Sequence, residues 1–128
     1  MKITKIDLLY CDPVEDGWRP AFCRIYTDEG IYGDGEIALS YAYVTNAAFG
    51  ILKDFAGMLI GMNPLNHEAI WQKLYRQSFF GLNGGPITFG GISAFDIALW
   101  DIKGKVYHAP LYELLGGKQR ETLRCYAS

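Results

Sequence analysis

The sequence lacks several features, and each absence excludes a class of protein. No apolar run approaches the roughly 18 residues of a membrane-spanning helix, and the first residues, Met1–Asp7, contain no apolar signal-peptide core. No block of like charge occurs: 12 basic and 14 acidic residues are interspersed and give a net charge of −2, which argues against a nucleic-acid partner or a polybasic membrane patch. The three cysteines are odd in number and widely spaced, so they predict reduced thiols in a cytoplasmic protein.

What is present is typical of a folded domain. Half of the 128 residues are hydrophobic and 15% are aromatic, a content that disordered chains do not have. The length allows one domain, or one domain and the start of another.

The N-terminal part of the chain has the period-two pattern of strands. A polar, turn-rich loop, Asp12–Pro20, separates the first two runs, and Gly30 can take the positive φ that a tight hairpin needs before the third. The strands are expected within residues 6–11, 22–27 and 31–38, as an antiparallel meander.

The central part of the chain has the three-and-four spacing of amphipathic helices. Helices are predicted over 44–59, from Asn66 through 75, and over 92–106, with a short fourth helix beginning at Pro110 and ending at Gly116. Ser40 is the expected N-cap of the first helix, and Leu99 lies at the centre of the buried stripe of the third. The expected fold class is therefore α+β, a three-stranded antiparallel meander followed by a helical bundle.

The tail, Thr122–Ser128, reads as a further strand. A strand needs a partner, since an unpaired edge invites aggregation. We therefore interpret the tail as the first strand of a domain that follows.

A pair of lysines, Lys103 and Lys105, is the first candidate for chemistry, because two amines can hold and deprotonate a carboxylate substrate. Residues two apart share a face on a strand, but this pair lies in a predicted helix, where two residues span about 200°. The two amines should point apart, and we interpret them as solvated, with Asp101 and Lys105 as an i,i+4 pair.

Other polar residues offer weaker candidates. Asp34 and Glu36 share one strand face and could begin a metal site, but no third ligand lies at useful spacing. His67 and His108 are isolated, and we interpret them as structural or surface residues. The glycines at 81, 84, 85, 90 and 91 lack the spacing and preceding strand of a dinucleotide fingerprint, so they predict a helix–helix connection.

Two loops are more promising, Asp12–Pro20 and Glu36–Tyr43, the second of which lies between the third strand and the first helix. Both mix polar groups with aromatic side chains, a composition that suits a lid over a ligand. The pattern alone leaves open whether the aromatics form such a lid or close the core. The lid candidates are Asp16, Trp18, Arg19, Ser40, Tyr41 and Tyr43.

Several stretches resemble one family, and together the resemblance covers the whole chain. Thr27–Glu36 resembles the second hairpin of the enolase superfamily's N-terminal capping domain, in the mandelate racemase and muconate lactonizing enzyme branch. Ile92–Lys105 resembles the third capping helix of that branch, and Pro110–Gly117 resembles the short helix and turn that follow. Tyr126–Ser128 is similar to the opening of the first barrel strand.

The resemblance implies a two-domain enzyme of which the barrel is absent here. Residues 1–117 would be the capping domain, and residues 118–128 the linker and first strand of a (β/α)-barrel needing about 200 further residues. In that family the barrel carries the catalytic residues and binds Mg²⁺, and the reaction begins with proton removal next to a carboxylate. The resemblance thus implies no catalytic residue and no metal ligand in this chain, which alone should be inactive.

Within the branch, Met1–Ile6 and Gly84–Ile87 are similar to the sugar-acid dehydratases. The implied parent is a cytoplasmic homo-oligomer that acts on an aldonate or aldarate, with no nucleic-acid or membrane partner. Three alternatives stay open: a racemase, a cycloisomerase, or a stand-alone binding or assembly module without catalysis. A small metal enzyme built on Asp34 and Glu36 is a weaker hypothesis.

Overall fold

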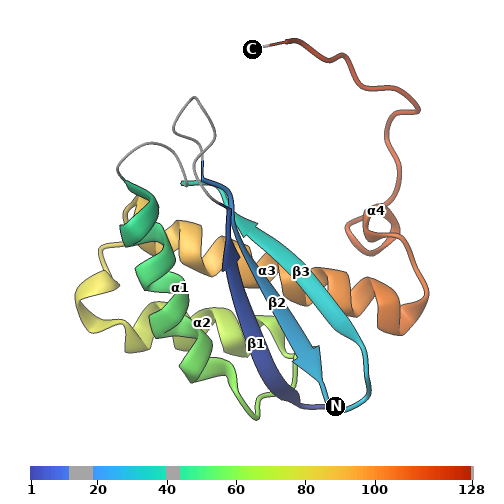
Figure 1. Ribbon diagram of the computed structural model, residues 1–128. Helices are drawn as coiled ribbons and strands as arrows, with labels where there is room; N and C mark the ends of the chain where they lie inside the picture. Colours follow the sequence, from blue (N-terminus) through green and yellow to red (C-terminus); the bar gives the residue numbers. More distant parts are fainter. Residues whose placement is uncertain (12–18, 40–43, 128) are drawn as a thin grey trace.

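Three strands open the chain and pair as an antiparallel meander in the order β1-β2-β3. The computed structural model describes residues 1–11, 19–39 and 44–127 (Figure 1). The strands are β1 (Ile3–Tyr10), β2 (Ala21–Thr27) and β3 (Tyr32–Ile37). Alternate residues of β2 and β3 are buried, as a sheet covered on one face requires. Gly30 has φ 77° in the turn between them, as predicted.

Two of the helices that follow, the first and the third α-helix, pack against one face of this sheet, and the other helical segments pack against helices (Figure 1). The helical segments are α1 (Thr45–Leu59), α2 (His67–Gln77), a short 3₁₀ turn η2 (Phe79–Gly81), α3 (Pro86–Tyr107) and α4 (Leu111–Leu114). The long helix α3 lies along β3 and also contacts α1 and α2, so it forms the centre of the core. The predicted α+β class is confirmed. No helix in the described ranges is long and apolar enough to cross a membrane.

The predicted stripe of α3 is buried from Ile92 to Ile102 and joins the core, and Val106 at its C-terminal end is half-buried. Phe95, Leu99 and Ile102 are each at most 1% exposed. The predicted stripe of α1 is buried only in part, because Val44 and Ala47, at its N-terminal end, are exposed while Leu52 is buried. The sheet, α1, α2 and α3 therefore share one hydrophobic core.

Helix α3 begins at Pro86, so the prediction that Gly90 and Gly91 belong to a connecting loop was wrong. Both glycines lie inside the helix, where they allow neighbours to approach closely. A Cβ on Gly90 would lie 2.8 Å from a Leu39 methyl, and one on Gly91 would lie 2.9 Å from Ile51. Glycine at these two positions permits close packing. Because glycine is also common in turns, the sequence alone suggested a loop.

Two expected details at the ends of elements differ. Helix α1 begins at Thr45 with Val44 at its N-cap, not at Ser40, which lies outside the described residues. Residues 122–127 form no strand and are exposed, because no neighbouring strand in the described chain pairs with them. The assignment of residues 118–128 to a following barrel stays a prediction.

Candidate functional site

Both predicted lid loops leave the sheet from the same end. Tyr10, the last residue of β1, is the Cα partner of Ala21, the first residue of β2, and Ala21 is in turn the partner of Ile37, the last residue of β3. The three residues form one row across the sheet. The meander therefore brings the ends of both loops together, at the end of the sheet that is uppermost in Figure 1.

The base of the first loop is closed by a backbone hydrogen bond. The Cys11 N–H donates to the Pro20 carbonyl over 3.1 Å, which continues the β1–β2 pairing by one step. Arg19 is half-buried beside this base. Of the six lid candidates only Arg19 is described; Asp16, Trp18, Ser40, Tyr41 and Tyr43 lie outside the described residues.

A hollow of about 250 Å³ lies beside the loop ends, between β1 and the start of α1. The Tyr10 ring meets Phe49 edge-on with 4.8 Å between centroids. The Lys53 ammonium lies 4.9 Å from the Phe49 ring centroid, a cation–π distance. The hollow thus presents an aromatic wall, a cation and the side chains of Thr45 and Asn46.

Sequence reasoning missed this hollow. Its residues come from positions 10 and 45–53, and neither stretch contains a motif. The only available signal was that Tyr10 lies two residues before one predicted loop and that Asn46 and Phe49 follow the other. Such polar and aromatic groups can bind a hydroxylated anion.

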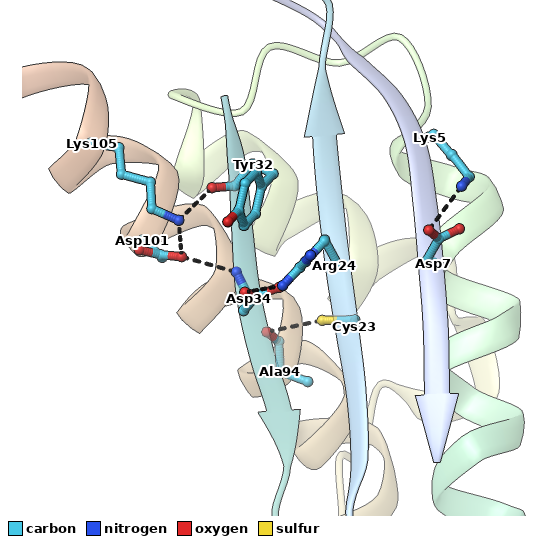
Figure 2. Close-up of polar contacts among 9 residues, drawn as sticks. All are labelled: Lys5, Asp7, Cys23, Arg24, Tyr32, Asp34, Ala94, Asp101 and Lys105. Carbon is cyan, nitrogen blue, oxygen red and sulfur yellow. Dashed lines mark hydrogen bonds and ion pairs between the residues drawn. The ribbon is translucent and has the colours of Figure 1, made fainter. Parts of the chain in front are cut away.

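A second polar cluster lies where β3 meets α3 (Figure 2). The Arg24 guanidinium binds the Asp34 carboxylate through Nε at 2.6 Å and Nη2 at 2.9 Å. On the helix side, the Asp101 carboxylate accepts the Asp34 backbone N–H at 3.0 Å and the Lys105 ammonium at 2.7 Å. Lys105 also donates to the Tyr32 carbonyl at 2.7 Å. Side chains of α3 thereby satisfy backbone groups at the open edge of β3.

The side chains of Lys103 and Lys105 point to different neighbours, as predicted. Lys105 is the i,i+4 partner of Asp101, whereas the Lys103 ammonium lies 4.5 Å from the Trp100 ring centroid. Their ammonium groups therefore do not converge on a common partner.

The metal-site hypothesis has no support from this cluster. Both Asp34 oxygens are held by Arg24, whose hydrogen bonds and charge lower the pKa of that carboxyl. Glu36 is exposed, and no three His, Cys, Asp or Glu side chains in the described ranges come together to hold a metal ion.

The remaining titratable candidates are structural. Burial raises the pKa of the Cys23 thiol to about 12, and its Sγ lies 3.4 Å from the Ala94 carbonyl that it faces, so the thiol stays protonated and unreactive. His67 is buried with its ring edge-on to Trp100 at 4.7 Å, and neither ring nitrogen has a hydrogen-bond partner. His108 is exposed at the end of α3, with φ 51°.

The chain matches known proteins over nearly its whole length. Residues 18–116 match the family described as mandelate racemase / muconate lactonizing enzyme, N-terminal domain. The chain is 44% identical over 128 residues to D-galactonate dehydratase of Pectobacterium atrosepticum, a match that covers 99% of this chain and 31% of the relative. It therefore spans about a third of the length of the curated relatives that it matches.

Solved structures show the same fold. A crystal structure from Zymomonas mobilis ZM4 is 53% identical with a TM-score of 0.92, over 96% of this chain and 32% of that one. An enolase of Pantoea ananatis, solved with bound D-gluconate and Mg, is 35% identical with a TM-score of 0.80, over 92% of this chain and 28% of that one.

Proposed function

Because this chain belongs to the N-terminal domain family of the mandelate racemase and muconate lactonizing enzyme branch of the enolase superfamily, we propose that it is the capping domain of a sugar-acid dehydratase. One observation supports a sugar acid as the substrate class: the sequence similarity to D-galactonate dehydratase extends over nearly the entire chain. The D-gluconate in the Pantoea relative supports the same class.

The proposed reaction removes water from a sugar acid. A proton leaves the carbon next to the carboxylate, the hydroxyl on the following carbon departs as water, and the resulting enol becomes a 2-oxo acid. The described residues contain neither a lysine pair on one face nor a carboxylate cluster for magnesium. We therefore assign the proton transfers and the metal site to the part of the protein that follows.

The proposed role of this domain is to close over the substrate and recognise it. Both loops begin and end at the same end of the sheet, where they can act together as a single cover, and this supports the proposed role. Asp16, Trp18, Arg19, Ser40, Tyr41 and Tyr43 would line that cover. Aromatic side chains there would exclude water, which strengthens electrostatic interactions with the charge that develops during proton removal.

The proposal is tested by assaying the full-length protein with Mg²⁺ against a library of aldonates and aldarates. We expect at least one acid to lose one water and give a 2-oxo acid, detected by mass spectrometry. A matched control is an acid without a hydroxyl on the carbon β to the carboxylate, which cannot be dehydrated. The 128-residue chain alone should convert none of them.

The alternatives give different results in the same assay. Exchange of the α-proton with solvent deuterium without loss of water would indicate a racemase. Ring opening or closure without a change in mass would indicate a cycloisomerase. Neither exchange nor turnover by the full-length protein would contradict the enzyme proposal and favour a binding or assembly module. The cytoplasmic location and homo-oligomeric state stay predictions.

A further inference from the structure

One face of α1 borders the hollow beside Tyr10 and carries a lysine without an ionic partner in the described chain. Asn46, Phe49 and Lys53 follow one another at steps of three and four, so their side chains share this face. The Lys53 ammonium lies 4.9 Å from the Phe49 ring centroid and forms no ion pair with a described residue. An aromatic ring therefore positions a cation whose charge no described carboxylate neutralises.

The hollow has the electrostatics of an anion site. The six described residues that line it are Tyr10, Thr45, Asn46, Phe49, Gly50 and Lys53. None of them is acidic, and the first turn of α1 carries no acidic side chain, so the positive end of the helix dipole adds to the charge of Lys53. A carboxylate in the hollow would gain an ammonium partner, and no lining residue would repel it.

Gly50 keeps the hollow open. A Cβ at this position would meet nothing within 4 Å, whereas one on Gly91 would lie 2.9 Å from Ile51. Packing within the described chain therefore does not require glycine at position 50, and the space that its missing side chain leaves belongs to the hollow. A ligand can enter there without displacing the core.

The lining residues match the chemical parts of a sugar acid. The Lys53 ammonium can bind a carboxylate, and the exposed Asn46 amide can donate to one hydroxyl and accept from another. The rings of Tyr10 and Phe49, which meet edge-on at 4.8 Å, offer an apolar surface for the carbon chain. A hollow with one cation, one amide and an aromatic wall thus suits a hydroxylated carboxylate.

We propose that the hollow binds the end of the sugar acid that does not react, and that Lys53 selects a second carboxylate there. This inference rests on the proposed function, because it needs a reacting carboxylate bound elsewhere in the full-length protein. No three metal-ligating side chains come together in the described ranges, so a carboxylate beside Lys53 is not the one next to the proton that leaves. The hollow also lies beside the bases of both loops, where we place the cover over the substrate. The substrate class is therefore the aldarates, which carry a carboxylate at each end, rather than the aldonates, which carry one.

The substrate preference of the full-length protein with Mg²⁺ tests the proposal. The two probes are an aldarate and the aldonate of the same configuration, in which a CH₂OH group replaces the second carboxylate. We expect a higher kcat/KM for the aldarate. Lys53→Met should lower the aldarate-to-aldonate ratio of kcat/KM at least fivefold, because a charge-assisted hydrogen bond is lost. Lys53→Arg keeps the charge and should keep the preference.

Lys2→Met is the matched control for Lys53→Met. Both lysines are exposed, but Lys2 lies next to the opposite end of β1 from Tyr10. The control should leave the aldarate-to-aldonate ratio unchanged. Equal ratios for the two methionine variants overturn the proposal, and so does a wild-type protein that prefers the aldonate.

Two glycines of α1 allow the hollow to be filled without removing its charge. A Cβ meets nothing within 4 Å at Gly50 or at Gly57, so leucine at either position should leave the core intact. Only Gly50 lines the hollow. We expect Gly50→Leu to raise KM for the aldarate at least fivefold and Gly57→Leu to leave it unchanged. Equal KM values for these two variants contradict the proposal.

Acetylation of the lysines of the full-length protein measures occupancy without relying on turnover. With Mg²⁺ and an aldarate kept in large excess, acetylation of Lys53 should slow at least fivefold and that of Lys2 should not change. The alditol of the same configuration, which has no carboxylate, should protect neither lysine. Unchanged acetylation of Lys53 overturns the inference whether or not the protein is active. Protection of Lys53 in a protein that dehydrates no acid refutes the proposed function alone, and an active dehydratase with an unprotected Lys53 refutes this inference alone.

Discussion

At the scale of single residues, two glycines on β3 set the distance between the sheet and α3. A Cβ on Gly33 would lie 2.0 Å from the Ala98 carbonyl oxygen, and one on Gly35 would lie 1.9 Å from that of Ala94. Both obstacles are backbone atoms on the buried face of α3, which cannot move aside as a flexible side chain can. The strand and helix can therefore be this close only because both positions lack a side chain.

Gly35→Ala should lower the free energy of unfolding by about 3 kcal/mol, at the upper end of overpacking costs. Urea unfolding of this chain measures the change. Gly57→Ala in α1 is the matched control, since a Cβ there meets nothing within 4 Å. The control should stabilise the chain by about 0.5–1 kcal/mol, as expected for replacing glycine in a helix. Similar small effects of both substitutions would contradict the close contact.

His67 should make stability depend on pH. Burial, followed by the positive charge of Lys103, lowers its pKa in the folded chain, although the charge of Asp96, the nearby Leu99 backbone carbonyl and the charge of Glu68 oppose this shift. The unfolded chain therefore takes up the proton first. Stability is fully present above about pH 6.5, the ordinary histidine pKa, and is lost as the pH falls below it.

His67→Leu should flatten this dependence and leave stability at pH 7 or above equal or higher, because neither imidazole nitrogen has a partner to lose. Unfolding measured between pH 7.5 and pH 5 checks the prediction. The wild-type slope just below pH 6.5 should exceed that of the variant by up to about 1.4 kcal/mol per pH unit, the limit for one proton. Identical slopes would show that His67 is not the group responsible.

At the scale of elements, α3 is the helix around which the others pack. Leu99 is 1% exposed at the centre of its buried stripe. Leu99→Ala should therefore cost roughly 2–5 kcal/mol of unfolding free energy, from lost transfer energy and the residual cavity. Ser93→Ala on the exposed side of the same helix should change stability by less than about 0.5 kcal/mol. A loss under about 1 kcal/mol for Leu99→Ala in denaturant melts would contradict the buried face.

The sequence predicted the elements well where one periodicity dominates. The strands and the inner stripe of α3 were found because alternation and the three-and-four repeat directly reflect burial on one face. The start of α3 was missed because Gly90 and Gly91 look like turn residues, whereas their role is to admit Leu39 and Ile51. The expected strand after residue 121 has no partner among the described residues, and strand pairing is not a local property.

At the scale of the whole molecule, the sequence indicated the proposed lid only as two separate loops. The register of the three strands brings the bases of these loops into one row. The sequence did not predict this, because hydrophobic periodicity does not give the register of strands that a long loop separates. The hollow beside Tyr10 was not predicted, because it joins residues more than 30 positions apart. The divergence of Lys103 and Lys105 was predicted correctly, since helix geometry alone directs their side chains to different neighbours.

The account's central claim is that this domain recognises the substrate and leaves the chemistry to the domain that follows. Its most direct test is the ratio of kcat/KM values for two sugar acids, measured for the full-length protein and its Trp18→Ala and Tyr41→Ala variants. The account predicts that each variant lowers kcat/KM and changes that ratio, while the free energy of unfolding stays nearly unchanged. Strong destabilisation with an unchanged ratio would contradict it, because Trp18 and Tyr41 would then close the core instead of covering the substrate.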